Sequence, residues 1–188
     1  PLASTPGFSS GIQVRQSRRS GAVQAIAVLT DAWTQVWLSA EMKAIQAKVD
    51  AMLPGRINWL SCGNCQSPKS VLVYSSADRL PGEFLVYRPA ADRWQGIGSV
   101  RPEVDPTRMA RLEFHRTKAR DGAELPVWVT RGLGDEAKPK PAVVLVHGGP
   151  WARGASWAWD AEAQFPASRG YVVIEPEFRG STGYGEKH

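Results

Sequence analysis

The sequence of 188 residues is poor in the side chains that most often carry metal and redox chemistry, with three histidines and two cysteines. The cysteines form one Cys62-Gly-Asn-Cys65 pair, and no second Cys/His pair lies at a spacing suited to a structural zinc site. Thioredoxin-like chemistry needs a C-x-x-C motif that opens a helix, whereas a loop and a strand are expected after Cys65. We therefore expect no cofactor, and either two free thiols or a tight disulfide, which would indicate an oxidising compartment.

Long apolar runs and a concentrated basic surface are missing too. No run approaches the length of a membrane span. The net charge is +5, but Lys and Arg are scattered apart from Arg15, Arg18 and Arg19, so we do not expect a nucleic-acid surface. No signal peptide is visible. Because the sequence begins at Pro1 without Met and stops at His188 just after a loop, we expect a piece of a longer protein, with its compartment and oligomeric state left open.

The first half of the chain contains short apolar segments separated by turn residues, the pattern of an antiparallel meander. Residues 1–20 are interpreted as irregular chain or part of a broken-off blade. Strands are expected at residues 22–29, near Trp33 and Trp37, and at 56–60, 71–74 and 83–88. Such a meander is the unit of a propeller blade, although no internal repeat of blade length is visible.

One helix is expected in this half, over residues 41–53. Its apolar residues lie at a helical spacing, and Pro54-Gly55 ends it. We interpret this stripe as core packing; it consists of Met42, Ile45, Val49 and Met52.

The composition shifts to Pro, Asp and charged residues between Arg101 and Arg111, and we place a domain boundary there, between residues 1–105 and 106–188. Beyond it, Asp121-Gly122 lies between two alternating segments, 112–117 and 124–130. Asp-Gly in this position is a strong signal for a β-hairpin.

The second half is organised around Pro141 to Pro150. Five apolar residues, Ala142 to Val146, lead into His147-Gly-Gly-Pro150, which predicts a strand buried on both faces and ended by a glycine turn. A helix over 157–169 and a strand over 171–174 would complete a βαβ unit. Ligands bind at the carboxyl ends of such strands, so exposed backbone N–H groups are expected there. The alternative is that Gly-Gly-Pro merely ends a strand.

Three motifs in this half occur together in one known family. His147-Gly-Gly-Pro-Trp-Ala-Arg153, Ser168-Arg-Gly-Tyr171 and Phe178-Arg-Gly-Ser-Thr-Gly-Tyr-Gly185 resemble the prolyl oligopeptidase family of serine peptidases, in its acylaminoacyl-peptidase and dipeptidyl-peptidase-like branch. The resemblance is sharpest over about residues 110–188 and weaker over about 40–110. It implies a mixed α/β fold, in which an antiparallel meander from the end of a β-propeller (1–105) precedes the first part of an α/β-hydrolase sheet (106–188).

The resemblance also assigns roles in the loop after the central strand. Hydrolases of this fold combine one N–H from this loop with the N–H that follows the nucleophile. By resemblance, Gly149 supplies the first oxyanion donor through its backbone, while Gly148 and Pro150 shape the loop.

A nucleophile is harder to place, because the sequence contains no G-x-S-x-G elbow. Ser181 comes nearest, but Arg179 stands where the elbow needs Gly, and we interpret Ser181 as a turn residue. His115 falls in a hairpin strand, His147 shapes the oxyanion loop by resemblance, and His188 is terminal. We therefore expect the nucleophile, the acid and the base beyond residue 188.

These observations predict a fragment of a serine peptidase that hydrolyses short peptides through an acyl-enzyme and is inactive in isolation. The alternatives are a fragment of an esterase or lipase, or a non-catalytic binding module, of the same fold. The resemblance to α/β-hydrolases implies that the strand at 142–146 lies between the strand at 171–174 and the strand that leads to the nucleophile. In the isolated chain it would be an unpaired edge, so we expect poor solubility, oligomers or partial folding.

Overall fold

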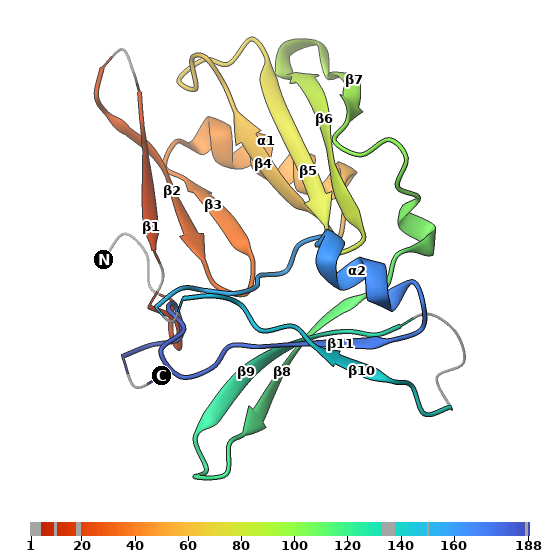
Figure 1. The fold of residues 1–188 in the computed structure, drawn as a ribbon. Coiled ribbons are helices and arrows are strands. Elements are labelled where there is room, and N and C mark those ends of the chain that lie inside the picture. The colour runs from red at the N-terminus through yellow and green to blue at the C-terminus, as the bar shows by residue number, and fades with distance from the viewer. Residues whose placement is uncertain (1–4, 10, 18–19, 133–137, 150, 187) are drawn as a thin grey trace.

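The computed structural model describes residues 5–9, 11–17, 20–132, 138–149, 151–186 and 188, and within them the strands form three sheets (Figure 1). The first sheet contains β1 (Ile12–Gln16), β2 (Val23–Leu29) and β3 (Trp33–Trp37). The second contains β4 (Ile57–Ser61), β5 (Val71–Ala77), β6 (Leu80–Arg88) and β7 (Arg93–Ser99). The third contains β8 (Leu112–Lys118), β9 (Glu124–Thr130), β10 (Ala142–Val144) and β11 (Val172–Pro176). The chain is thus rich in sheet, with two α-helices in the described part.

The first two sheets are antiparallel meanders, as the sequence pattern predicts, and neighbours in sequence pair in space. Two strands were not predicted. β1 lies in the segment expected to be irregular or part of a blade, and β7 follows the turn formed by the short 3₁₀ helix η1 (Pro89–Ala91). The signal for β7 is weak because it contains Gly96 and Gly98, and most of its residues are exposed. Its pairing with β6 is what makes it a strand.

Helix α1 (Ala40–Met52) forms where the sequence predicts it. The Ser39 side chain caps it by accepting the Met42 backbone N–H at 3.2 Å. Met42, Ile45 and Val49 face inward and join a cluster with apolar residues of the first two sheets, whereas Met52, the last member of the predicted stripe, is 56% exposed. The cluster comprises Ala25, Trp37, Met42, Ile45, Val49, Leu60, Cys65, Val71, Val73 and Tyr87.

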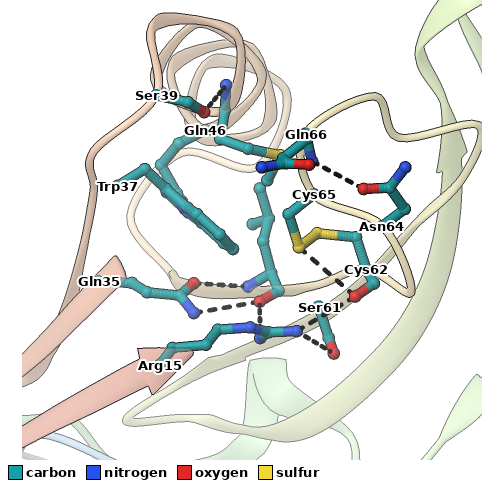
Figure 2. Close-up of a disulfide and its surroundings, with 12 residues drawn as sticks. Arg15, Gln35, Trp37, Ser39, Gln46, Ser61, Cys62, Asn64, Cys65 and Gln66 are labelled. Atoms are coloured by element: carbon teal, nitrogen blue, oxygen red, sulfur yellow. Dashed lines mark hydrogen bonds between the residues drawn. A yellow bond between two sulfur atoms is a disulfide. The ribbon is translucent and has the colours of Figure 1, made fainter. Parts of the chain in front are cut away.

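Cys62 and Cys65 form a disulfide, so of the two alternatives left open by the sequence the structure contains the tight loop (Figure 2). The loop lies where the first two sheets meet. Arg15 of β1 donates to the carbonyl oxygens of Leu60 and Cys62 and to the Ser61 hydroxyl, at 3.1–3.4 Å. Gln35 of β3 both accepts from the Leu60 N–H and donates to its carbonyl. These side chains therefore tie the first sheet to the end of β4. Among the described residues no group of His, Cys, Asp and Glu could hold a metal ion.

The third sheet has the order β10-β11-β9-β8. β8 and β9 form the predicted hairpin, and Gly122 adopts φ +85° in its turn. β10 runs parallel to β11, with helix α2 (Ala161–Ala167) between them in sequence, as expected of a βαβ unit.

The prediction that residues 142–146 are buried on both faces is wrong for this structure. β10 has only three residues and lies at the edge of the described sheet, where Val144 and Val146 are each 59% exposed. Side chains alternate between the two faces of a strand, and Leu145 packs toward the cluster that contains α2, whereas Val144 and Val146 lie on the opposite face, which no described element covers. The edge position itself agrees with our expectation for this strand in the isolated chain.

The helix predicted over 157–169 is shorter, because tertiary contacts delay its start. The Trp157 N–H donates to the Asp31 carbonyl at 2.7 Å, which holds this residue against the β2–β3 turn. The Asp160 carboxylate then caps α2 by accepting the Ala163 N–H at 2.9 Å. Pro166 lies in the last turn, after which Gly170 takes φ +87°. No helix in the described part is long and apolar enough to cross a membrane.

The segment between β7 and β8 connects the second and third sheets through buried polar contacts. It contains a second 3₁₀ helix, η2 (Pro106–Arg108). The Gln164 side chain of α2, 5% exposed, accepts the Ala110 N–H at 2.9 Å and donates to the Ala110 carbonyl at 2.8 Å. Gln164 also donates to the carbonyl of Asp78, whose carboxylate accepts the Leu112 N–H. The β5–β6 turn, this segment and α2 are thus joined at one point.

Candidate functional site

The candidate site is the loop of residues 147–155, which begins just beyond the carboxyl end of β10. Gly148 and Gly149 are exposed at its tip. Gly149 has φ +150°, and a Cβ added there would lie 3.2 Å from the Trp151 nitrogen, so a side chain would strain the loop. The Gly149 amide donates to no acceptor among the described residues. Pro150 lies outside the described residues, and its role in shaping the loop stays a prediction.

His147 fixes the direction of the peptide between the two glycines. Its Nδ1 lies 2.7 Å from the Gly148 carbonyl oxygen, and because a carbonyl only accepts, Nδ1 carries the hydrogen. A trans peptide points its C=O and the following N–H in opposite directions. The Gly149 N–H is therefore directed away from the imidazole. The ring itself stacks on Phe178, with centroids 4.3 Å apart.

The other ring nitrogen of His147 faces two polar side chains from the segment after β11. Nε2 lies 3.0 Å from Ser181 Oγ and 3.4 Å from Glu177 Oε2. With the hydrogen on Nδ1, a neutral ring accepts the Ser181 hydroxyl hydrogen at Nε2. Sequence reasoning considered His147 and Ser181 separately and missed Glu177 altogether. The only available signal for Glu177 was its position directly after a strand.

This group has the composition of a Ser-His-acid triad but a different geometry. In a triad the acid binds one ring nitrogen and the serine binds the other. Here Ser181 and Glu177 approach the same nitrogen, and the second nitrogen is occupied by Gly148. Ser181 is also only 3% exposed, so a substrate carbonyl could not reach its hydroxyl. The three side chains support the loop and do not have the geometry of a triad.

Glu177 is 1% exposed and is satisfied mainly by backbone. Its two carboxylate oxygens accept the Gly154 N–H at 3.1 Å and the Ala155 N–H at 2.6 Å. Gly154 must remain small because a Cβ there would lie 2.2 Å from the His147 ring. The far end of the loop is thus packed against its beginning.

A pocket of about 130 Å³ beneath this loop is lined on one side by carboxylates. Burial raises the pKa of Glu175 to about 7, and the nearby charges of Asp160, Glu177 and Glu162 add to the increase. Glu175 precedes Glu177 by two residues, yet it makes no hydrogen bond to the loop among the described residues.

Arg153 lies within the loop, and its head group is enclosed by aromatic rings. The guanidinium carbon is 4.5 Å from the Tyr184 centroid and 5.9 Å from that of Phe8. Its Nε donates to the Ala155 carbonyl, while Nη1 and Nη2 are buried without a hydrogen-bond partner in the described part of the chain. Gly183 allows this approach, since a Cβ there would lie 3.0 Å from Nη1.

The remaining histidines are not brought to the tip of the loop. His115 lies in β8, where it pairs with Glu113 at 3.0 Å on an exposed face; this hydrogen bond lowers the pKa of Glu113. His188 Nε2 lies 3.1 Å from the carbonyl oxygens of both Glu177 and Phe178 and so contributes to the segment after β11.

Comparison with known proteins found no matching family model. Dipeptidyl aminopeptidase BIII of Pseudoxanthomonas mexicana is 31% identical over 176 residues, which cover 89% of this chain and 25% of that protein. Dipeptidyl-peptidase 5 of Trichophyton equinum is 39% identical over 71 residues, or 36% of this chain and 10% of that protein. A puromycin-hydrolyzing peptidase of Mycobacterium tuberculosis superposes with a TM-score of 0.62 at 22% identity, covering 92% of this chain and 26% of that structure.

The structural match shows a shared fold over the covered part, and the sequence matches show common descent. The chain belongs to the prolyl oligopeptidase family of serine peptidases. It spans about a quarter of the length of the relative that it matches over most of its residues.

Proposed function

We propose that the chain is the part of a serine peptidase in which a β-propeller meets the catalytic domain. Residues 1–105 would be the end of the propeller, and residues 106–188 the start of an α/β-hydrolase domain. The observation that carries the functional proposal is the Gly149 amide. It stands beyond the carboxyl end of β10 without an acceptor among the described residues, and the His147–Gly148 contact directs it away from the imidazole.

In this proposal the Gly149 N–H stabilises the charge that develops on the substrate carbonyl oxygen when a serine attacks its carbon. One such donor contributes about 3–4 kcal/mol to lowering the barrier. The nucleophile, acid and base would follow residue 188, because on this fold the triad occurs in the order Ser, Asp or Glu, His. An isolated chain of 188 residues would then be inactive.

Short peptides are the substrates that we propose for the whole protein. The relatives bear the names of dipeptidyl peptidases, and a propeller above the catalytic domain would restrict entry to small peptides. Water would then hydrolyse the acyl-enzyme, which releases the acyl part of the peptide and regenerates the serine.

The test is to express the complete protein and to assay it with peptide anilides and aryl esters, beside labelling with a fluorophosphonate. We expect anilide hydrolysis and covalent labelling of the complete protein, and neither in the 188-residue chain. Hydrolysis of aryl esters alone would make it an esterase, and neither activity nor labelling would make it a binding module. Labelling of the short chain that disappears in Ser181→Ala would contradict the assignment of Ser181.

A further inference from the structure

Glu177 joins the two ends of the candidate oxyanion loop through one buried carboxylate. At the end of the loop it accepts the Gly154 and Ala155 N–H groups, at 3.1 and 2.6 Å. At the start of the loop its Oε2 lies 3.4 Å from His147 Nε2, which carries no hydrogen in the neutral ring, so this approach is a packing contact and not a hydrogen bond. The chain between these contacts contains Gly148 and Gly149, whose conformation has to be held from outside because glycine itself restricts it so little.

From this arrangement we infer that Glu177 is a positioning residue for the oxyanion donor. The inference rests on the proposed function and deepens it, since it names the group that sets the geometry of the Gly149 N–H. The connection runs from the Glu177 carboxylate to the Gly154 and Ala155 N–H groups, from Gly154 to the His147 ring against which it packs, and from the Nδ1–H of that ring to the Gly148 carbonyl. This last hydrogen bond fixes the orientation of the Gly148–Gly149 peptide and so the direction of the Gly149 N–H. Glu177 itself touches no substrate.

The backbone of Glu177 is itself held in place by hydrogen bonds. The Glu177 N–H donates to the Pro126 carbonyl of β9 at 2.9 Å, and its carbonyl accepts from His188. Phe178 stacks on the imidazole, and Ser181 holds Nε2 from the side. The carboxylate therefore presents a fixed acceptor pair to the end of the loop, and donors need about 0.5 Å precision to act on a transition state.

Glu177→Gln is the informative change, because it keeps the size of the side chain but replaces one acceptor oxygen by an NH₂ donor that faces a backbone N–H. In the complete peptidase we expect kcat to fall about 100-fold, as a displacement of about 1 Å near the reacting atoms would cause, with KM within about twofold. Glu177→Asp keeps both oxygens on a shorter stem and should recover part of kcat. Glu175→Gln, two residues away without a hydrogen bond to the loop, is the matched control and should leave kcat within about twofold.

Amide hydrogen exchange at Gly154 and Ala155 gives a readout that does not depend on catalysis. We expect exchange to accelerate about tenfold or more in Glu177→Gln and to remain unchanged in Glu175→Gln. Should Glu177→Gln fail to fold, Glu177→Asp carries the same two measurements.

A folded Glu177→Gln peptidase with the kcat of the wild type would overturn the inference, and where Glu177→Gln does not fold, a Glu177→Asp peptidase with both the kcat and the exchange rates of the wild type would do so. So would a loss that lies wholly in KM, since a positioning residue acts in the transition state. If the wild-type protein hydrolyses nothing, the proposed function fails, and the exchange rates still decide whether Glu177 holds the loop.

Discussion

The second sheet and the third sheet differ in the contacts that stabilise each of them internally. The second sheet and α1 share a closed core of large apolar side chains, among them Met42, Leu60, Val71 and Val73, each 0% exposed. Between the third sheet and α2 lies a smaller cluster of three alanines and Val173, with Leu145 packed against it, while Trp128 of β9 is buried against Phe114. Buried polar groups supplement it, namely Gln164 and Glu177. The region that bears the candidate site is therefore positioned by hydrogen bonds as much as by apolar packing.

This difference agrees with the role that we propose for each region. Apolar packing is non-directional, and it suffices to hold a meander together. A loop that presents a backbone N–H at a fixed point needs directional contacts, and these contacts must be buried to exclude competition from water. Four experiments test the comparison.

The largest effect is expected at the loop itself. Gly149→Pro in the complete peptidase removes the proposed donor and cannot adopt φ +150°. We expect kcat to fall about 100- to 1000-fold with little change in KM, measured on a peptide anilide. The thermal unfolding curve has to match that of the wild type, and a folded variant with near-normal kcat would place the donor elsewhere.

The buried polar contacts are tested next by Gln164→Leu. Leucine leaves the Ala110 N–H and carbonyl buried without partners, where Gln164 now binds both. We expect the free energy of unfolding to fall by about 3 kcal/mol, measured with urea. Exposed Gln66→Leu is the control, with a change within about 0.5 kcal/mol. Equal values for the two variants would mean that the apolar cluster alone holds α2.

A matched pair of strand valines tests the apolar packing. Val73 in β5 is 0% exposed and Val144 in β10 is 59% exposed. In the chain of 188 residues, Val73→Ala should lower the free energy of unfolding by about 2 kcal/mol, and Val144→Ala should change it by less than about 0.5 kcal/mol. In a longer protein in which further chain covers the exposed face of β10, the two values should approach each other. A similar cost for both in the short chain would show that β10 is already covered, for example by a second copy.

The smallest effect concerns the carboxylates beneath the loop. The folded pKa of Glu175 is raised from 4.5 to about 7, so the folded chain binds the proton more tightly than the unfolded chain. The stabilising contribution is complete below about pH 4.5 and is lost as the pH rises through about 7. Partial exposure reduces it to the order of 1 kcal/mol. Unfolding free energies from pH 4 to 8 should therefore decline less in Glu175→Gln than in the wild type, and parallel curves would contradict the shift.

The amino-acid sequence by itself determined the elements whose signals are local. The spacing of Met42, Ile45 and Val49 predicts α1, and Asp121-Gly122 predicts the hairpin. The motifs around His147 and Phe178 indicate the family, which the comparisons support. Each of these signals is contained in a short segment of consecutive residues, so it can be recognised without knowing which other segments lie nearby.

Only the tertiary structure decided the rest. The start of α2 depends on Asp31, more than a hundred residues earlier in the chain, and β7 depends on pairing with β6. Glu177 and His147 meet only because β11 runs beside β10 and brings the segment after it to the loop. The sequence contains many possible partners for one hydrogen-bonding group. Which of them it meets depends on the path of the backbone through the folded structure.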